Sequence, residues 1–400
     1  MDRSQSTENP AEATPDPVQA QCRRLADTGV VRVRGNGFHL AIVGTRGVPA
    51  RYGGFETFAA ELSRRLVIGR GHRVTVYCRS SLYPDMSGDW EGVERIELPS
   101  IGHKYLETVS HSLASAIDAR KRDFDAVLVC NAANAFVLPL FRTYRIPVAL
   151  NVDGIERARK KWNIFGKMVY QIGESWTVGF ADAVVADAGV IRDYYRSRFG
   201  VETTVIPYGS SLPEGRSDVL ERLGLEPRRY ILYVSRFEPE NNPLAVVEAY
   251  RKLDTEIPLV MVGSAPYSSE LITRLHEHRS ERVVFPGAVY GADYAALQRH
   301  ALIYIQATEV GGTHPALIEA MGSGGAVLAN GTPENREAGG AVVGYFELGE
   351  RETLSARLEE LLADSSRLES MREPARRRAA ELYDWEKVTD RYEELFLGMI

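Results

Sequence analysis

The chain has 400 residues, which is enough for two or three domains that each bury a core. Its composition, 44% hydrophobic and 26% charged, is that of an ordinary soluble protein, and a net charge of -6 speaks against an extended nucleic-acid surface. Three scattered cysteines, Cys22, Cys78 and Cys130, predict neither a disulfide framework nor a zinc site and favour a reducing compartment.

Residues 1–36 are rich in Ser, Glu, Pro and Ala and contain no apolar stretch of the kind found in signal peptides or membrane anchors. We interpret them as a disordered tail. The most apolar long window, Ala126 to Phe141, contains Asn131, Asn134 and Pro139, so it predicts strand, turn and helix and not a membrane span. We therefore expect a cytoplasmic protein, with peripheral contact at the membrane left open.

Short apolar runs then alternate with helix-period segments. The first series of predicted strands is Phe38–Val43, Arg73–Tyr77, Val93–Leu98, Asp125–Cys130, Pro147–Val152, Asp182–Ala186 and Thr203–Ile206. The second series is Tyr230–Ser235, Pro258–Val262, Arg282–Phe285, Leu302–Gln306, Ala326–Ala329 and Val342–Phe346. Such alternation predicts parallel sheets with helices on both faces, so we expect an α/β protein with two doubly wound, Rossmann-like domains.

The two series are separated by a polar stretch that follows Pro207. We place an N-terminal domain at residues 37–208 and a C-terminal domain at residues 209–383. The last segment, residues 384–400, is predicted to be a helix that can pack back on the N-terminal domain. Ligands of open α/β sheets bind beyond the carboxyl ends of the strands, so two facing sheets would enclose a central cleft.

The loop after the first strand reads GTRGVPARYGGFE, residues 44–56. Its Gly53-Gly54 pair opens a helix and is typical of an anion site, because glycines let the backbone approach a ligand and the first N–H groups of a helix attract negative charge. Arg46 and Arg51 could add positive charge for a phosphate or an anionic acceptor, or they could be solvated surface arginines. The G-x-G-x-x-G spacing of a dinucleotide fold is absent, which speaks against NAD.

The fifth strand is followed by NVDGIE, residues 151–156. Asp153 stands where the strand ends and a glycine turn begins, so it could deprotonate or steer an acceptor hydroxyl, or it could cap the next helix. Residues 157–176 mix five basic residues with aromatic and aliphatic ones. This mixture suits a helix at an anionic lipid surface, although a helix with one core face and one solvated face has the same pattern.

In the second half, Arg236 follows a strand in VSRFEPENN, residues 234–242. It could clamp a phosphate bidentately, or pair with Glu238 or Glu240. Gly263 ends the next strand and could line the pocket for a nucleotide base. No cluster of His, Cys and Asp has the spacing of metal ligands, so we predict no essential metal.

Residues 309–325, EVGGTHPALIEAMGSGG, are the most informative stretch. Gly311, Gly312 and Thr313 lead into a short helix that carries Glu319. The start of the helix suits a diphosphate, and a glutamate one turn further can accept hydrogen bonds from hydroxyls, so the stretch predicts a nucleotide-sugar site. The alternative is a plain connection between loop, helix and strand with an exposed glutamate.

Four of these segments resemble the retaining GT-B glycosyltransferases of family 4, and more narrowly their rhamnosyltransferase-type branch. They are GTRGVPARYGGFET, ALNVDGIE with RKKW, YVSRFEPENN and EVGGTHPALIEAMGSG, and the resemblance extends over residues 38–398. It implies that a sugar moves from a nucleoside diphosphate to a hydroxyl with retention of anomeric configuration. It also implies an acceptor site in the N-terminal domain, a donor site in the C-terminal domain, and no cofactor beyond the dTDP-, UDP- or GDP-linked donor.

Three residues match motifs of that family. Glu319 corresponds to the second glutamate of its Glu-x7-Glu motif, which binds the nucleotide ribose, and Arg236 corresponds to its diphosphate arginine. Gly54 corresponds to the glycine whose amide approaches the phosphates. By resemblance, these three residues belong to the donor site.

Three other positions depart from the broad family. Gly311 stands at the first glutamate of the motif, with Glu309 two residues away as a candidate replacement. Asn241 stands at the diphosphate lysine, and Asp153 stands at a histidine near the acceptor. We therefore expect Asp153, Arg236 and Glu309 to take part in catalysis.

The expected function is glycosyl transfer in cell-surface polysaccharide synthesis, with L-rhamnose from dTDP-rhamnose and a saccharide or polyprenyl-linked acceptor as candidates. Two alternatives stay open. One is a nucleotide-sugar epimerase of the same fold, which would need no acceptor. The other is a non-catalytic protein that binds sugar nucleotides, for which the absent lysine argues.

Overall fold

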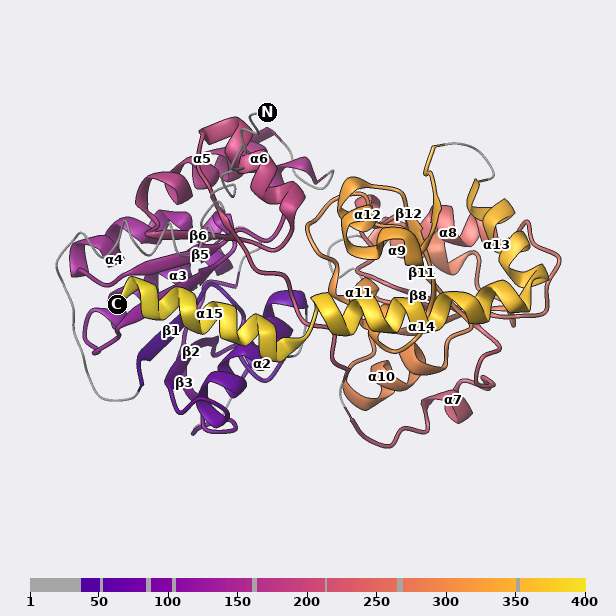
Figure 1. The fold of residues 1–400 in the computed structure, drawn as a ribbon, viewed down its shortest axis with the longest axis horizontal. Helices are drawn as coiled ribbons and strands as arrows, with labels where there is room; N and C mark the ends of the chain where they lie inside the picture. Colours follow the sequence, from indigo (N-terminus) through magenta and orange to yellow (C-terminus); the bar gives the residue numbers. More distant parts are fainter. Residues whose placement is uncertain are drawn as a thin grey trace, which may run out of the picture.

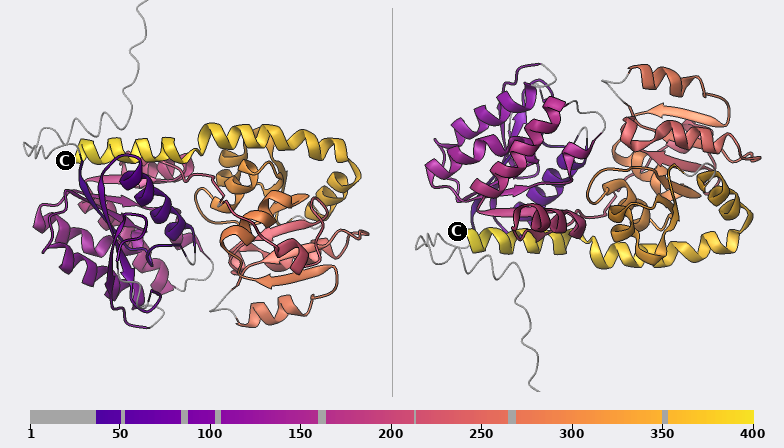
Figure 2. Two further views of the ribbon diagram at one scale, coloured as in Figure 1. Left: turned by 90° about the horizontal axis from the view of Figure 1, so that it is seen from below. Right: turned by 90° about the horizontal axis from the view of Figure 1, so that it is seen from above.

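The computed structural model describes residues 37–50, 53–83, 88–102, 106–159, 164–212, 214–264, 269–349 and 353–400. They form two α/β units that lie beside each other along the long axis of the molecule, each built on its own sheet (Figures 1 and 2). Near its end the chain returns from the second unit to the first, so that the last helix lies on the first unit.

The first sheet has the strand order β3-β2-β1-β4-β5-β6-β7, and its neighbouring strands pair in parallel. Its central strands are buried along their whole length, which explains why they read as continuous apolar runs without alternation. The strands are β1 (His39–Val43), β2 (Arg73–Arg79), β3 (Glu94–Leu98), β4 (Ala126–Cys130), β5 (Val148–Asn151), β6 (Ala183–Ala186) and β7 (Thr204–Val205).

Helices follow these strands and cover both faces of the first sheet (Figure 1). They are α2 (Gly54–Ile68), α3 (Glu107–Ala119), the 3-10 helix η1 (Ala132–Val137), α4 (Leu138–Tyr144), the 3-10 helix η2 (Glu156–Ala158), α5 (Ile164–Phe180) and α6 (Gly189–Phe199).

The second sheet has the order β10-β9-β8-β11-β12-β13 and is also parallel. Its strands are β8 (Ile231–Val234), β9 (Leu259–Val262), β10 (Val283–Gly287), β11 (Ile303–Gln306), β12 (Ala326–Asn330) and β13 (Gly344–Phe346). Its helical elements are α7 (Val219–Arg222), η3 (Pro239–Asn241), α8 (Pro243–Tyr250), α9 (Ser269–His276), α10 (Gly291–His300), α11 (Pro315–Gly322), α12 (Pro333–Gly339), η4 (Gly340–Val342), α13 (Thr353–Ala363) and α14 (Ser365–Leu382). The predicted doubly wound α/β fold is confirmed, and each predicted strand overlaps an observed one.

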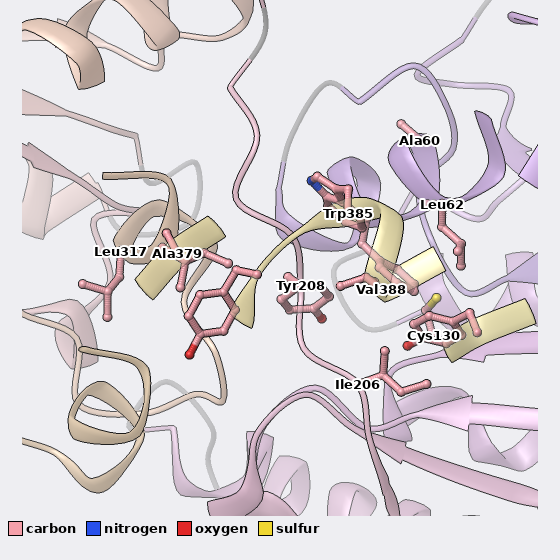
Figure 3. Close-up of a cluster of buried hydrophobic side chains, with 14 of the residues drawn as sticks. Ala60, Leu62, Cys130, Ile206, Tyr208, Leu317, Ala379, Trp385 and Val388 are labelled. Carbon is pink, nitrogen blue, oxygen red and sulfur yellow. The ribbon is translucent and has the colours of Figure 1, made fainter. Parts of the chain in front are cut away.

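The C-terminal helix α15 (Trp385–Met399) packs on the first unit, whereas α14 before it lies on the second (Figures 1 and 2). Figure 3 shows Trp385 and Val388 of this helix in a hydrophobic cluster with Leu62, and with Tyr208 from the segment that joins the two units. A Cβ on Gly209 would lie 2.3 Å from the Trp385 ring, so only glycine fits there. Both chain crossings between the units therefore meet at Trp385.

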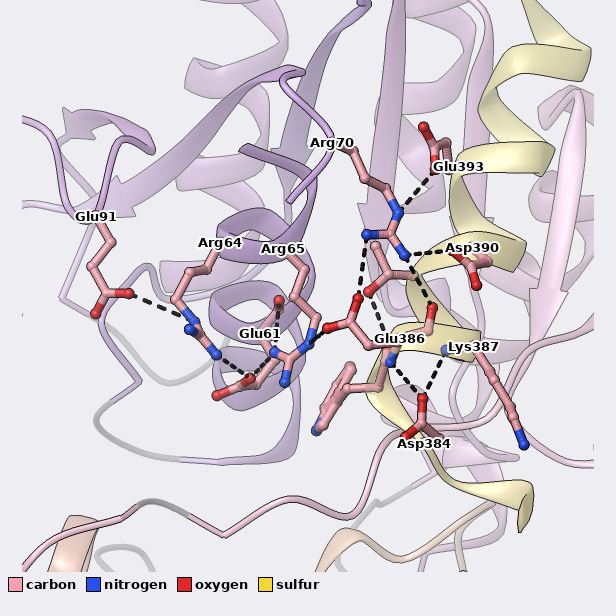
Figure 4. Close-up of polar contacts among 12 residues, drawn as sticks. Glu61, Arg64, Arg65, Arg70, Glu91, Asp384, Glu386, Lys387, Asp390 and Glu393 are labelled. Atoms are coloured by element: carbon pink, nitrogen blue, oxygen red, sulfur yellow. Dashed lines mark hydrogen bonds and ion pairs between the residues drawn. The ribbon is translucent and has the colours of Figure 1, made fainter. Parts of the chain in front are cut away.

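Ion pairs and hydrogen bonds also hold α15 on the first unit (Figure 4). Arg70 forms ion pairs with Glu386 at 3.3 Å and Glu393 at 3.0 Å, and a short one with Asp390. His72 Nε2 lies 2.7 Å from Glu393 Oε1. Apolar and ionic contacts thus hold α15 on the first unit.

Candidate functional site

The predicted donor loop, residues 309–314, lies between β11 and α11 and contacts the carboxyl end of β6 from the other unit. The Thr313 backbone N–H donates to Asp187 Oδ2 at 2.7 Å, and the Thr313 hydroxyl donates to the Asp187 backbone oxygen at 2.7 Å. A Cβ on Gly312 would lie 2.0 Å from Asp187 Oδ1, and one on Gly154 would lie 2.7 Å from the Gly311 carbonyl carbon. The glycines therefore allow a direct crossing of loops from the two units.

Asp187 did not emerge from the sequence analysis, although it follows a strand as Asp153 does. Its side chain is buried, and Oδ1 has no hydrogen-bond partner among the described residues. Burial raises the pKa of Asp187 well above its usual range, and the nearby carboxylates of Asp153 and Glu337 raise it further, whereas the Thr313 amide lowers it. Applied to every strand, the rule that ligands bind at carboxyl ends would have found this residue.

Glu319 lies inside the protein, on α11. Its side chain is 7% exposed and accepts a short hydrogen bond from the Tyr294 hydroxyl of α10, which in turn accepts one from Gln298 Nε2 at 3.0 Å. Burial raises the pKa of Glu319 from 4.5 to about 7, and the charge of Glu61 on α2 raises it as well, whereas the Tyr294 hydrogen bond lowers it. The alternative of an exposed glutamate is therefore wrong.

The starts of α2 and α11 face each other. Gly53 is the N-cap residue of α2, and a Cβ on Gly54 would lie 3.4 Å from Pro315 Cγ. Glu56 in the first turn of α2 accepts a hydrogen bond from the Arg46 backbone N–H at 3.1 Å. The two helix starts predicted to bind anions thus meet at the interface; Arg51 lies outside the described residues.

Asp153 adopts a left-handed backbone conformation with φ of 58° directly after β5. Its Oδ1 accepts a hydrogen bond from the Tyr208 hydroxyl at 2.7 Å. Burial and Glu156 raise the pKa of Asp153, against the opposing effects of Tyr208, Arg159 and Arg236. The next helical turn, η2, has no side-chain cap, so the predicted capping role at that turn is wrong.

Arg236 belongs to the second unit, and its charge lowers the pKa of Asp153 in the first unit. The Arg236 side chain is 41% exposed, and its Nη1 lies 3.9 Å from Glu238 Oε1, beyond hydrogen-bond distance. Asn241 Nδ2 donates to the Arg236 backbone oxygen at 2.7 Å. Asn241 therefore shapes the loop that carries Arg236 and does not supply the charge of the absent lysine.

Gly263 and Glu309 take part in local backbone contacts. A Cβ on Gly263 would lie 1.9 Å from the Ser235 oxygen, so glycine lets the ends of β8 and β9 approach each other. Glu309 Oε1 accepts a hydrogen bond from Asn242 Nδ2 at 3.2 Å, and the Glu309 backbone N–H donates to the Glu240 backbone oxygen at 2.9 Å. These contacts place Glu309 beside η3, at the loop that follows Arg236.

Two of the basic residues predicted to face lipid have partners inside the protein. Arg159 is buried, with its Nε 2.6 Å from Glu156 and its Nη1 3.6 Å from Glu240 of the second unit. Arg157 Nε lies 3.3 Å from Glu174 Oε1. A lipid role is therefore wrong for Arg159, which joins the two units.

Among the described residues, no group of three or more His, Cys, Asp or Glu side chains could hold a metal ion. Within the same ranges, no helix combines the length and the apolar character needed to cross a bilayer.

Residues 218–378 match the family model described as "Glycosyl transferases group 1". The chain carries a group 1 glycosyltransferase domain. Residues 38–211 match a domain of unknown function, DUF1972. The match over residues 218–378 indicates that the activity is glycosyl transfer from a nucleotide sugar.

Two characterised relatives have names that specify lipid products or acceptors. The alpha-monoglucosyldiacylglycerol synthase of Streptococcus pneumoniae is 23% identical over 318 residues, which are 74% of this chain and 72% of the relative. The GDP-mannose-dependent alpha-(1-6)-phosphatidylinositol monomannoside mannosyltransferase of Mycobacterium tuberculosis is 24% identical over 326 residues, 72% of this chain and 80% of the relative.

Solved structures share the two-unit GT-B fold. Sucrose-phosphate synthase from Thermosynechococcus elongatus superposes with a TM-score of 0.76 at 18% identity, covering 90% of this chain and 99% of its own. Anabaena Alr3699/HepE in complex with UDP-glucose gives a TM-score of 0.75 at 15% identity, covering 90% and 100%. At these identities the likeness establishes the fold alone.

Proposed function

We propose that the protein transfers a sugar, with retention of anomeric configuration, from a nucleoside diphosphate to a hydroxyl of a saccharide or lipid-linked acceptor. L-rhamnose from dTDP-rhamnose is the candidate donor, and cell-surface polysaccharide synthesis in the cytoplasm, or at the cytoplasmic face of the membrane, is the candidate setting. One observation carries the proposal: the start of α11, with the buried Glu319, faces Gly54 at the start of α2 in the other unit. Two helix starts and a carboxylate suit a diphosphate and the hydroxyls of a ribose.

In this mechanism the anomeric C–O bond breaks, and the sugar gains oxocarbenium character while negative charge grows on the diphosphate. Arg236 and the amides of Gly54 and of the Gly311–Thr313 loop stabilise that charge. The acceptor oxygen bonds to the anomeric carbon on the face from which the diphosphate leaves, which retains the configuration, and Asp153 orients the acceptor hydroxyl and takes up its proton. Burial supports this role, because it raises the pKa of Asp153 and makes the carboxylate a stronger base.

A lipid-linked acceptor has support from both relatives, whose printed names specify glucosyldiacylglycerol and phosphatidylinositol mannoside. Large apolar side chains on α5 are exposed at a spacing of four residues: Ile164 at 79%, Met168 at 52%, Ile172 at 48% and Trp176 at 38%. A second exposed row, which the sequence analysis did not single out, lies on and just before α3 and consists of Leu106, Val109, Leu113 and Ile117. Such rows suit the surface of a bilayer.

The membrane part of the proposal is tested by sedimentation with vesicles of phosphatidylglycerol and phosphatidylcholine. We expect Met168→Asp with Ile172→Asp to release the protein from the vesicles, because each charge must leave water on insertion. Ser366→Asp with Ser370→Asp, two exposed positions on α14 of the second unit, is the control and should bind like the wild type. Equal sedimentation of all three proteins would contradict membrane contact through α5.

The donor is tested by screening dTDP-, UDP- and GDP-sugars for thermal stabilisation of the purified protein. A ligand that binds only the folded state raises the melting temperature, because by mass action it adds about 2.7 kcal/mol to the free energy of unfolding at 100 times its Kd. Incubation of that donor with and without acceptor separates a transferase from an epimerase, which converts the sugar without acceptor. The proposal fails if no nucleotide sugar stabilises the protein.

A further inference from the structure

The carboxylate of Asp187 is hydrogen-bonded to the backbone amide of Thr313, which the proposed function assigns to the diphosphate. Its Oδ2 accepts the Thr313 N–H at 2.7 Å, and the Thr313 hydroxyl donates to the Asp187 backbone oxygen at the same distance. A carboxylate on a backbone N–H just before a helix makes the same kind of charge-assisted contact as a phosphate oxygen. The residue directly follows β6, in the unit expected to bind the acceptor.

The two loops lie too close for a diphosphate to share this place with Asp187. A Cβ on Gly312 would already lie 2.0 Å from Asp187 Oδ1. One on Gly154 would lie 2.7 Å from the Gly311 carbonyl carbon. A phosphate group is much larger than a methyl group, so it can reach the Thr313 amide only after Asp187 has moved away.

Asp187 is also poorly stabilised as an anion. It is buried, and its Oδ1 has no hydrogen-bond partner among the described residues. Burial raises its pKa, and the carboxylates of Asp153 and Glu337 raise it further. A buried carboxylate with one satisfied oxygen and two like charges nearby is easily displaced by a ligand that brings its own hydrogen-bond acceptors.

We propose that Asp187 is an internal competitor of the donor: its carboxylate holds the Thr313 amide while no donor is bound, and the diphosphate displaces it. The inference rests on the proposed function, because it takes the Gly311–Thr313 loop as the diphosphate site. Asp187 then limits the affinity for nucleoside diphosphates and links donor binding to the contact between the two units.

Isothermal titration of UDP, dTDP and GDP into the full chain tests the proposal, with Asp187→Asn as the variant and Glu337→Gln as the matched control. The Glu337 carboxylate also accepts backbone N–H groups across the interface, from Gly189 at 2.6 Å and Val190 at 2.9 Å, but these amides belong to the start of α6 and not to the Gly311–Thr313 loop. We expect Asp187→Asn to bind the preferred diphosphate about tenfold more tightly, because a charged competitor is lost. Glu337→Gln should stay within about threefold of the wild type.

Unchanged or weaker binding by a folded Asp187→Asn protein would overturn the proposal. Equal tightening by both variants would also overturn it, because Asp187 would then act only by holding the units together. If the wild type binds none of the three nucleotides, the proposed function itself fails. Asp187→Ser, which removes the carboxylate but keeps a small polar side chain, gives the same readout if the asparagine variant does not fold.

Discussion

Glu319→Gln should stabilise the protein at alkaline pH while it weakens donor binding. In the folded chain the pKa of Glu319 is raised from 4.5 to about 7, chiefly by burial. An acid with a raised pKa binds its proton more tightly in the folded state, so its ionisation destabilises the fold. That cost is absent below pH 4.5, grows as the pH rises towards about 7, and is constant above it.

The size of the effect follows from the same two values. The difference between 4.5 and about 7 corresponds to about 3 kcal/mol, at about 1.4 kcal/mol for each pH unit. Glutamine keeps an acceptor for the Tyr294 hydroxyl but carries no charge. We therefore compare the free energy of unfolding of Glu319→Gln with that of the wild type at each pH. The difference should favour the mutant by about 3 kcal/mol more at pH 8 than at pH 4.5. For a domain of this size that is roughly 6–12 °C in melting temperature.

The assay is thermal unfolding of both proteins between pH 4.5 and pH 8, with donor binding measured at pH 8. Tyr294→Phe is an internal check: it removes the hydrogen bond that lowers the pKa of Glu319, so the stability of that variant should begin to level off at a higher pH. Loss of a hydrogen bond between a charged group and a hydroxyl should weaken donor binding about tenfold or more in Glu319→Gln. A stability difference that does not change with pH would refute the reasoning.

Two further predictions concern the return of the C-terminal helix. Trp385→Ala should destabilise the first unit by about 3–5 kcal/mol, because the buried ring packs against Gly209 and Phe58. Denaturant unfolding measures this loss, and a value below about 1 kcal/mol would mean that α15 does not support the unit. Arg70→Ala should cost at most about 1 kcal/mol, and less at high salt, because two of its three partners, Glu386 and Asp390, are exposed. A larger or salt-independent loss would contradict that ranking.

The fold could be predicted from sequence because buried parallel strands read as unbroken apolar runs between helix-period segments. The site was harder to predict. Glu319 and Gly54 belong to recognisable helix starts, whereas the partner of Thr313 is Asp187, 126 positions earlier in the chain. The position of Asp187 after a strand makes it a candidate, but no local pattern shows that its partner is Thr313. The bridging role of Arg159 likewise depends on a contact between distant segments, because its partner Glu240 lies in the other unit.

The central claim is that Arg236 and the facing helix starts stabilise the departing diphosphate. Its most direct test is the rate of nucleoside diphosphate release from the preferred donor, with acceptor present, in the wild type and in Arg236→Ala. Losing one such preorganised group costs about 3–4 kcal/mol in the transition state, so turnover should fall by roughly 100-fold or more. Near-normal turnover in a folded Arg236→Ala protein would contradict the account.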